Sequence, residues 1–60
     1  MCEAAAWMLE DGQKQKLMDN VVDITPEGDR LLLTDLFGEQ RLVKAEIEKI
    51  DLIAHEIFLK

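Results

Sequence analysis

The sequence predicts an all-β protein, built as a small, strongly bent antiparallel sheet or a partly open barrel. Five or six short stretches have the apolar patterns of strands, and turn signals separate them at intervals of about 8 to 12 residues. A chain of 60 residues hides only about 60% of its unfolded surface, so residues 1–60 are expected to form a single small domain.

The first third of the chain predicts a hairpin. Glu3–Glu10 is apolar on both faces of an extended chain, which fits a buried strand. Asp11-Gly12 follows, and these two residues tolerate the positive φ angles that a type I′ hairpin turn requires. The polar stretch Gln13–Met18 is therefore expected to return as the second strand.

The middle of the chain predicts two further strands. Asp19-Asn20 interrupts the pattern, and Val21–Ile24 is expected to form a separate β-branched strand that ends at Pro26. Glu27-Gly28-Asp29 predicts a turn, because proline lacks an N–H for pairing and glycine accepts unusual dihedral angles. Arg30–Asp35 contains three consecutive leucines between turn residues, which is typical of a central strand.

The last third is expected to contain two strands. Phe37-Gly38-Glu39 predicts a turn, and apolar and charged side chains alternate from Val43 to Glu48. This alternation favours one strand that continues to about Ile53, although an apolar helical stripe also fits the segment. A tight turn at Ala54-His55 and a final strand over Glu56–Lys60 complete the prediction.

Charge and composition narrow the class of function. Thirteen acidic residues oppose seven basic ones, and the net charge of -6 disfavours nucleic acid as a partner. Lys14 and Lys16 share one strand face and are interpreted as solvated. Because the chain has no signal peptide and no apolar run of roughly 20 residues, we expect a cytoplasmic protein without a membrane segment. Its single cysteine excludes an internal disulfide, which leaves a metal or pairing of edge strands in a homodimer to stabilise so small a domain.

Most polar residues have a structural interpretation. Glu46 and Glu48 share an exposed strand face and are expected to be solvated rather than catalytic. His55 falls in a predicted turn and is interpreted as a surface residue. Trp7 and Phe58 are expected to pack in the core, although a platform for stacking bases is the alternative. Since the chain also lacks serine and the familiar cofactor motifs, we expect that it is not an enzyme.

Cys2 is the residue whose position suggests chemistry. If Met1 is removed, the Cys2 thiol and α-amine close a five-membered chelate ring, and the deprotonated amide nitrogen of Glu3 adds a donor. Thiolate with nitrogen donors suits square-planar Ni(II) or Cu(II), and a dimer axis would double the donor set. The residues alone leave equally open that Cys2 is an incidental residue near a chain terminus.

Four motifs carry a family resemblance: "MCEA" at the start, "PEGD" from Pro26, "LFGEQ" from Leu36 and "DLIAHEIFL" near the end. In this order they resemble the CooT family of small nickel-binding proteins over essentially the whole chain. The resemblance implies an Sm-like or SH3-like β fold and a homodimer that holds Ni(II) at its interface through Cys2.

The resemblance further implies nickel storage, delivery or sensing, with a nickel enzyme such as carbon monoxide dehydrogenase, or its maturation factors, as partner. Two alternatives stay open, an Sm-like RNA-binding module and a structural interaction domain. Copper, zinc and cobalt also remain candidates for the ion.

Overall fold

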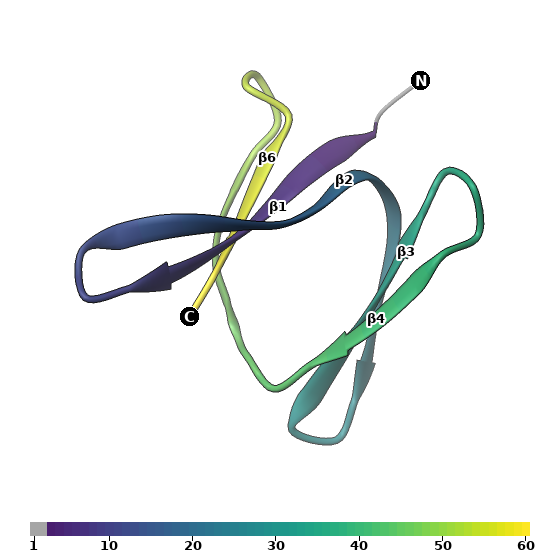
Figure 1. The fold of residues 1–60 in the computed structure, drawn as a ribbon, viewed down its shortest axis with the longest axis horizontal. Helices are drawn as coiled ribbons and strands as arrows, with labels where there is room; N and C mark the ends of the chain where they lie inside the picture. The colour runs from purple at the N-terminus through teal and green to yellow at the C-terminus, as the bar shows by residue number, and fades with distance from the viewer. Residues whose placement is uncertain (1–2) are drawn as a thin grey trace.

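A computed structural model describes residues 3–60, which form six strands and no helix (Figure 1). The strands are β1 (Ala4–Glu10), β2 (Gln13–Glu27), β3 (Arg30–Asp35), β4 (Gln40–Val43), β5 (Ile47–Asp51) and β6 (Glu56–Leu59). They form one sheet in the order β4-β3-β2-β1-β6-β5. The sheet bends round its core without closing, since no pairing joins β4 to β5 within the described residues. The predicted all-β, partly open architecture is confirmed.

The sheet is mixed rather than purely antiparallel. Four of the pairings are antiparallel, as predicted. The remaining one joins β1 to β6 in parallel, with Ala5 opposite Glu56 and Met8 opposite Leu59. Turn signals specify only neighbours along the chain, whereas this pairing joins two strands that are far apart in the sequence.

The predicted break at Asp19-Asn20 is a bend within one strand. β2 runs for 15 residues through this position. Asn20 has a φ angle of 56°, and the register with β1 and with β3 shifts around it. Val21 pairs with Ala4 of β1 and also with Asp35 of β3. Asparagine tolerates the left-handed conformation, so the residue that interrupts the pattern turns the strand without ending it.

The prediction of one continuous strand from Val43 to about Ile53 is wrong. The chain leaves the sheet over residues 44–46, so β4 and β5 lie at opposite edges. Ala45 within this link is buried, which explains why the alternation of apolar residues continues through it. Hydrophobic alternation records which side of the chain faces the core, and it does not record a change of strand partner.

The core contains small and aliphatic side chains from one face of the sheet and from the link 44–46. Its buried members are Ala6, Val21, Leu31, Leu33, Ala45, Ile57 and Leu59. In β6, Ile57 and Leu59 face this core while Phe58 does not, as predicted from the alternation. Trp7 and Phe58 lie directly opposite each other in the parallel pair and are only half-buried. The prediction that these two aromatic residues belong to the core is therefore wrong, because they occupy the outer face.

The turns fall into two groups, one near the N-terminus of the described chain and one away from it (Figure 1). The N-terminal end comprises Glu3, the bend at Asn20–Val22, and the turns 36–38 and 52–55. We call the rest the opposite end: the turn Asp11-Gly12, at the left of the view, and the turn Gly28-Asp29 and the link 44–46, at the bottom. At Asp11-Gly12 both residues have positive φ angles, 51° and 76°, as predicted for a type I′ hairpin.

Candidate metal centre

Of the two residues predicted to bind a metal, the structure describes one. Cys2 lies outside the described residues, and Glu3 is the first residue described. Glu3 is half-buried, and its carboxylate oxygen Oε2 is inaccessible to solvent without a hydrogen-bond partner among residues 3–60. A carboxylate oxygen without solvent or a donor is unfavourable, so this position favours a cation or a proton donor nearby.

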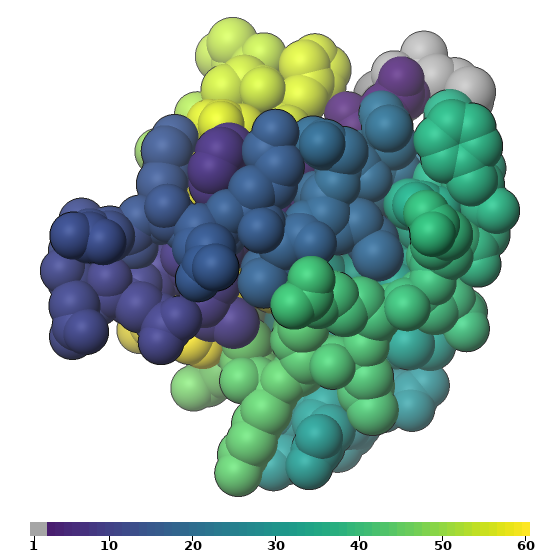
Figure 2. All heavy atoms as spheres, viewed as in Figure 1, coloured from purple at the N-terminus to yellow at the C-terminus, as the bar shows by residue number. Residues whose placement is uncertain are grey.

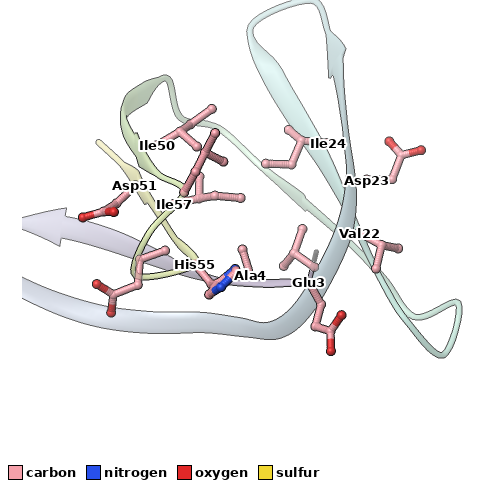
Figure 3. A pocket seen from close by; sticks show the side chains of 12 residues that line it. Glu3, Ala4, Val22, Asp23, Ile24, Ile50, Asp51, His55 and Ile57 are labelled. Atoms are coloured by element: carbon pink, nitrogen blue, oxygen red, sulfur yellow. The ribbon is translucent and has the colours of Figure 1, made fainter. Parts of the chain in front are cut away.

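A cavity of about 160 Å³ lies beside Glu3 (Figure 3). Ile24 of β2, Ile50 of β5 and Ile57 of β6 point toward one another across it. Glu3 and His55 lie on either side of Ala4, where β1 begins. The cavity is therefore lined by apolar side chains, with the ionisable side chains of Glu3 and His55 near the start of β1.

A hydrogen-bonded turn holds His55 at this cavity. The carbonyl of His55 accepts a hydrogen bond from the backbone N–H of Ala5, with a distance of 3.0 Å. Asp51 Oδ1 accepts the N–H groups of Ile53 and Ala54 at 3.1 and 2.9 Å. The bond from Ala54 is the main cause that lowers the pKa of Asp51 below its ordinary value. The side chain of His55 is exposed, as predicted, but it also lines the cavity.

Large apolar side chains are exposed around the same end. Ile53 is 94% exposed and Leu52 is 79% exposed at the turn 52–55. Phe37, at the turn 36–38, is 76% exposed. Figure 2 shows both turns projecting from the molecule, in yellow-green and in teal-green. The members of this apolar rim are Val22, Leu36, Phe37, Ile50, Leu52 and Ile53.

Hydrogen bonds to Asp35 and Asn20 hold the turn 36–38 in place. Asp35 is buried, and its Oδ1 accepts the N–H groups of Phe37 and Glu39 at 2.9 and 2.8 Å. The N–H of Leu36 donates to the carbonyl of Asn20 over 2.8 Å. The exposed side chains of this turn are therefore presented by a backbone that is fixed at both sides. The run of leucines predicts the strand before this turn, but nothing in the pattern indicates that Asp35 organises it.

The outer face of the sheet combines lysines with the two half-buried aromatic rings. Lys14 Nζ lies 4.4 Å from the centre of the Trp7 ring and 5.9 Å from that of Phe58. Lys16 Nζ lies 5.1 Å from the Trp7 ring, and Lys49 is directly opposite Phe58 in the pairing of β5 with β6. The two lysines predicted to be solvated thus also cover an aromatic surface by cation–π contact.

The described residues show no cluster of metal-binding side chains. No group of three or more His, Asp or Glu side chains within residues 3–60 could hold a metal ion. The ionisable side chains that line the cavity are Glu3, Asp23, Asp51, His55 and Glu56. A metal site at this end would therefore need further donors, from Cys2, from a second copy of the chain, or from both. Carboxylate, imidazole and thiolate with amine nitrogen form a set suited to a divalent transition metal. In the described part of the chain no helix is long and apolar enough to cross a membrane.

Comparison with known proteins gives a consistent result. The family described as "CO dehydrogenase accessory protein CooT" matches residues 1–60. An uncharacterized protein of Methanocaldococcus jannaschii, MJ1551, is 36% identical over 44 residues, which cover 73% of this chain and 77% of that protein. An uncharacterized protein of Archaeoglobus fulgidus is 35% identical over 43 residues, covering 72% and 96% respectively.

A solved structure extends the similarity to the fold. The crystal structure assigned to CooT of Carboxydothermus hydrogenoformans superposes with a TM-score of 0.92 at 31% sequence identity. The superposition covers 97% of this chain and 94% of that one. The open six-stranded sheet is therefore shared over nearly the full length of both chains.

Proposed function

Because this chain belongs to the CooT family of CO dehydrogenase accessory proteins, we propose that it binds Ni(II) for the maturation of a nickel enzyme. In this proposal nickel is cargo that is received and passed on. The protein is therefore a carrier or a sensor of the ion and not a catalyst. In this proposal the protein is located in the cytoplasm, where a cysteine thiol stays reduced.

The proposed ligands are at the chain terminus. Once Met1 is removed, Cys2 offers a thiolate and an α-amine on adjacent carbons, and the Glu3 amide nitrogen is a third donor. Both the thiol and the amine lose protons on binding, so affinity should rise with pH. Two chains related by an axis would supply two sulfur atoms and at least two nitrogen atoms, which is enough for square-planar Ni(II).

The observation that carries the proposal is the concentration of exposed apolar side chains where β1 enters the sheet. Leu52, Ile53 and Phe37 are exposed at the turns 52–55 and 36–38 of this end. An exposed apolar patch rimmed by polar groups is typical of a protein–protein interface. A second copy that covered the rim would bring two Cys2 residues to one place, so dimerisation and metal binding would support each other.

The test is an anaerobic Ni(II) titration of protein that mass spectrometry has shown to start at Cys2. We expect one ion per two chains and a thiolate-to-nickel charge-transfer band. Cys2→Ser should lose the band. A matched form with one extra residue before Cys2 keeps the thiol but not the chelating amine, and it should bind at least about tenfold more weakly. Equal affinity of all three proteins would refute the proposal.

A second candidate function rests on the lysine–aromatic outer face. Trp7 and Phe58 offer two adjacent rings, and Lys14, Lys16 and Lys49 border them. Base stacking on aromatic rings with phosphates on lysines is how many single-strand binders work. The net charge of -6 opposes this function. Salt-dependent quenching of Trp7 fluorescence by single-stranded RNA would support it, and no quenching at low salt would exclude it.

A further inference from the structure

We propose that the outer face of the sheet is a docking surface for an acidic segment of a partner protein. Four adjacent strands contribute one side chain each to this surface: Lys16 of β2, Trp7 of β1, Phe58 of β6 and Lys49 of β5. We call these four residues the lysine–aromatic row. The row includes neither Cys2 nor any member of the apolar rim, so nickel binding and this docking can fail separately.

The pairing register aligns the four side chains across the strands. Trp7 is directly opposite Lys16 on one side and Phe58 on the other, and Phe58 is directly opposite Lys49. Residues that are directly opposite each other project from the same face of a sheet. Neighbouring strands lie about 4.8 Å apart, so the backbones at Lys16 and Lys49 are separated by roughly 14 Å. The row therefore has a positive charge at each end and two aromatic rings between them.

Lysine side chains already cover the aromatic rings. Lys14 Nζ lies 4.4 Å from the centre of the Trp7 ring and 5.9 Å from that of Phe58, and Lys16 Nζ lies 5.1 Å from the Trp7 ring. The side chains of Lys14 and Lys16 are themselves 51% and 45% exposed. A base needs an open ring face for stacking, whereas a carboxylate needs only an accessible ammonium group. This arrangement favours an acidic peptide over a single-stranded nucleic acid.

The ammonium groups are available to a partner. Lys14 Nζ lies 3.9 Å from Glu56 Oε2, and Lys16 Nζ lies 3.1 Å from Asp19 Oδ1. Ion pairs near the surface contribute little stability, so these lysines can exchange partners readily. Lys49 forms no ion pair with another of residues 3–60. Three of the seven basic residues thus gather on this face of a chain that has thirteen acidic ones, and charge directs an acidic segment to it.

The position of Trp7 has no explanation within the fold. Trp7 is half-buried on the outer face, and its indole Nε1 is excluded from solvent without an acceptor among residues 3–60. A donor without an acceptor is unfavourable, so the indole N–H gives this position no stability. Tryptophan and phenylalanine are enriched at protein interfaces, where their rings supply contact area. An apolar side chain of the partner would cover both rings.

The length of the row predicts the pattern of the partner segment. An extended chain advances about 3.3 Å per residue, so residues four positions apart share a face and lie roughly 13 Å apart. Acidic residues at the first and fifth positions and an apolar residue at the third would therefore match Lys16, the two rings and Lys49. The next row along the strands is acidic, because Asp51 is directly opposite Glu56. Repulsion from this row would keep the segment aligned with the lysine–aromatic row.

The experiment follows the fluorescence of Trp7, the single tryptophan, during titration with a blocked nine-residue peptide. The peptide has glutamate, leucine and glutamate at its third, fifth and seventh positions in a Gly–Ser background. We expect a saturable change below about 1 mM peptide at low salt that weakens as salt is added. A peptide with glutamine in place of glutamate should bind at least about fivefold more weakly.

Variants of the protein locate the contact. The double variant Lys16→Gln, Lys49→Gln should bind the glutamate peptide about five- to tenfold more weakly than the wild type does. Lys44→Gln removes the same charge from an exposed lysine of the link 44–46, outside the row, and serves as the matched control. It should bind as the wild type does. Circular dichroism should show that all three proteins are folded.

Several outcomes would overturn the proposal. They are no saturable change up to about 1 mM peptide, equal affinity for the glutamate and glutamine peptides, and an equal loss in Lys44→Gln. If single-stranded oligouridine changes the fluorescence and the peptide does not, the face binds nucleic acid instead. If dilution of the protein alone changes it, the occupant is a second copy of the chain. The Ni(II) titration of the double variant is expected to match the wild type, whichever result the peptide gives.

Discussion

The two ends of the molecule make their turns from different residues. At the opposite end the turns are Asp11-Gly12 and Gly28-Asp29, where short polar residues and glycine adopt the positive φ angles. At the N-terminal end the turns contain Leu36-Phe37 and Leu52-Ile53, all of them exposed. The backbone geometry is satisfied at both ends, so the apolar residues at one end have no role in making the turns.

This difference indicates where the molecule makes contacts. Turn residues are usually small or polar, because turns lie in water. Exposed leucine, isoleucine and phenylalanine therefore need an explanation beyond folding, and an interface provides one. Positive φ angles occur at both ends, including Gly38 and His55 at the N-terminal end. Only the N-terminal end also stabilises its turns with side-chain acceptors, Asp35 and Asp51, among the described residues. Four experiments test this contrast, described from the largest expected effect to the smallest.

The first changes the apolar rim. The double variant Leu52→Glu, Ile53→Glu should be monomeric, since losing a buried interface anchor commonly weakens association by about 2 kcal/mol or more, roughly 30-fold. Ile47→Glu changes an exposed isoleucine next to the link 44–46 and should remain dimeric. Sedimentation velocity at several concentrations measures the outcome. A monomeric wild type, or a dimer that only Ile47→Glu disrupts, would show that the apolar rim is not the dimer interface.

The second compares an aspartate from each end. Asp35→Ala leaves two backbone N–H groups of the turn 36–38 without their acceptor, and we expect a loss of about 2 kcal/mol in the free energy of unfolding. Asp29→Ala removes only exposed ion pairs to Arg30 and Lys44 and should change it by less than about 0.5 kcal/mol. Urea denaturation gives both values. Equal losses would contradict the contrast between the ends.

The third concerns conformation at the opposite end. Gly12 has a φ angle of 76° and open space where a Cβ would be, so the loss in Gly12→Ala is conformational alone. We expect about 1 kcal/mol of destabilisation, and clearly less for Gly12→Asn, because asparagine tolerates this region. Thermal unfolding monitored by circular dichroism should show the order. A larger loss for the asparagine variant would refute the conformational explanation.

The fourth is a small effect of pH at the N-terminal end. The backbone N–H of Ala54 lowers the pKa of Asp51 below its ordinary value of 3.8 in the folded chain. The carboxylate therefore stabilises the fold above pH 3.8, and this contribution is lost as the pH falls through the lower, folded-state pKa. Melting temperatures between about pH 5 and pH 2 should fall less steeply for Asp51→Asn than for the wild type. Parallel curves would show that Asp51 contributes nothing.

Patterns among neighbouring residues predict the turns and most strands correctly. They do not predict which strands pair when these lie far apart in the sequence. Asp11-Gly12 and the leucines of β3 specify their own conformations, so the sequence predicts them. Asn20 specifies a positive φ angle, which ends one strand or bends a continuous one, and only the pairing of β2 with both β1 and β3 distinguishes these outcomes. The parallel partner of β6 and the outward position of Trp7 likewise depend on residues distant in the chain.

The candidate site is predictable only in part. Cys2 and Glu3 follow from chemistry at the terminus, and the structure describes only Glu3. The sequence predicts a surface residue at His55, and its side chain is exposed. Its place at the cavity depends on a hydrogen bond from Ala5, fifty positions earlier, which the sequence does not indicate. The alternation does not identify the exposed apolar pair Leu52-Ile53, because it places this pair at the end of a strand. The signal that the sequence does offer is the position of this apolar pair between the polar strand β5 and His55, where a turn would ordinarily be polar.

The parallel pairing of β1 with β6 also bears on how the molecule is made. β1 lies inside the sheet, yet one of its two neighbours is β6, the strand farthest from it along the described chain. Pairing between distant segments is slow, since a long loop must close first. A polypeptide that is truncated before β6 therefore leaves one edge of β1 without a partner. We expect such a polypeptide to be prone to aggregation, because an unpaired strand edge is a template for pairing with other chains.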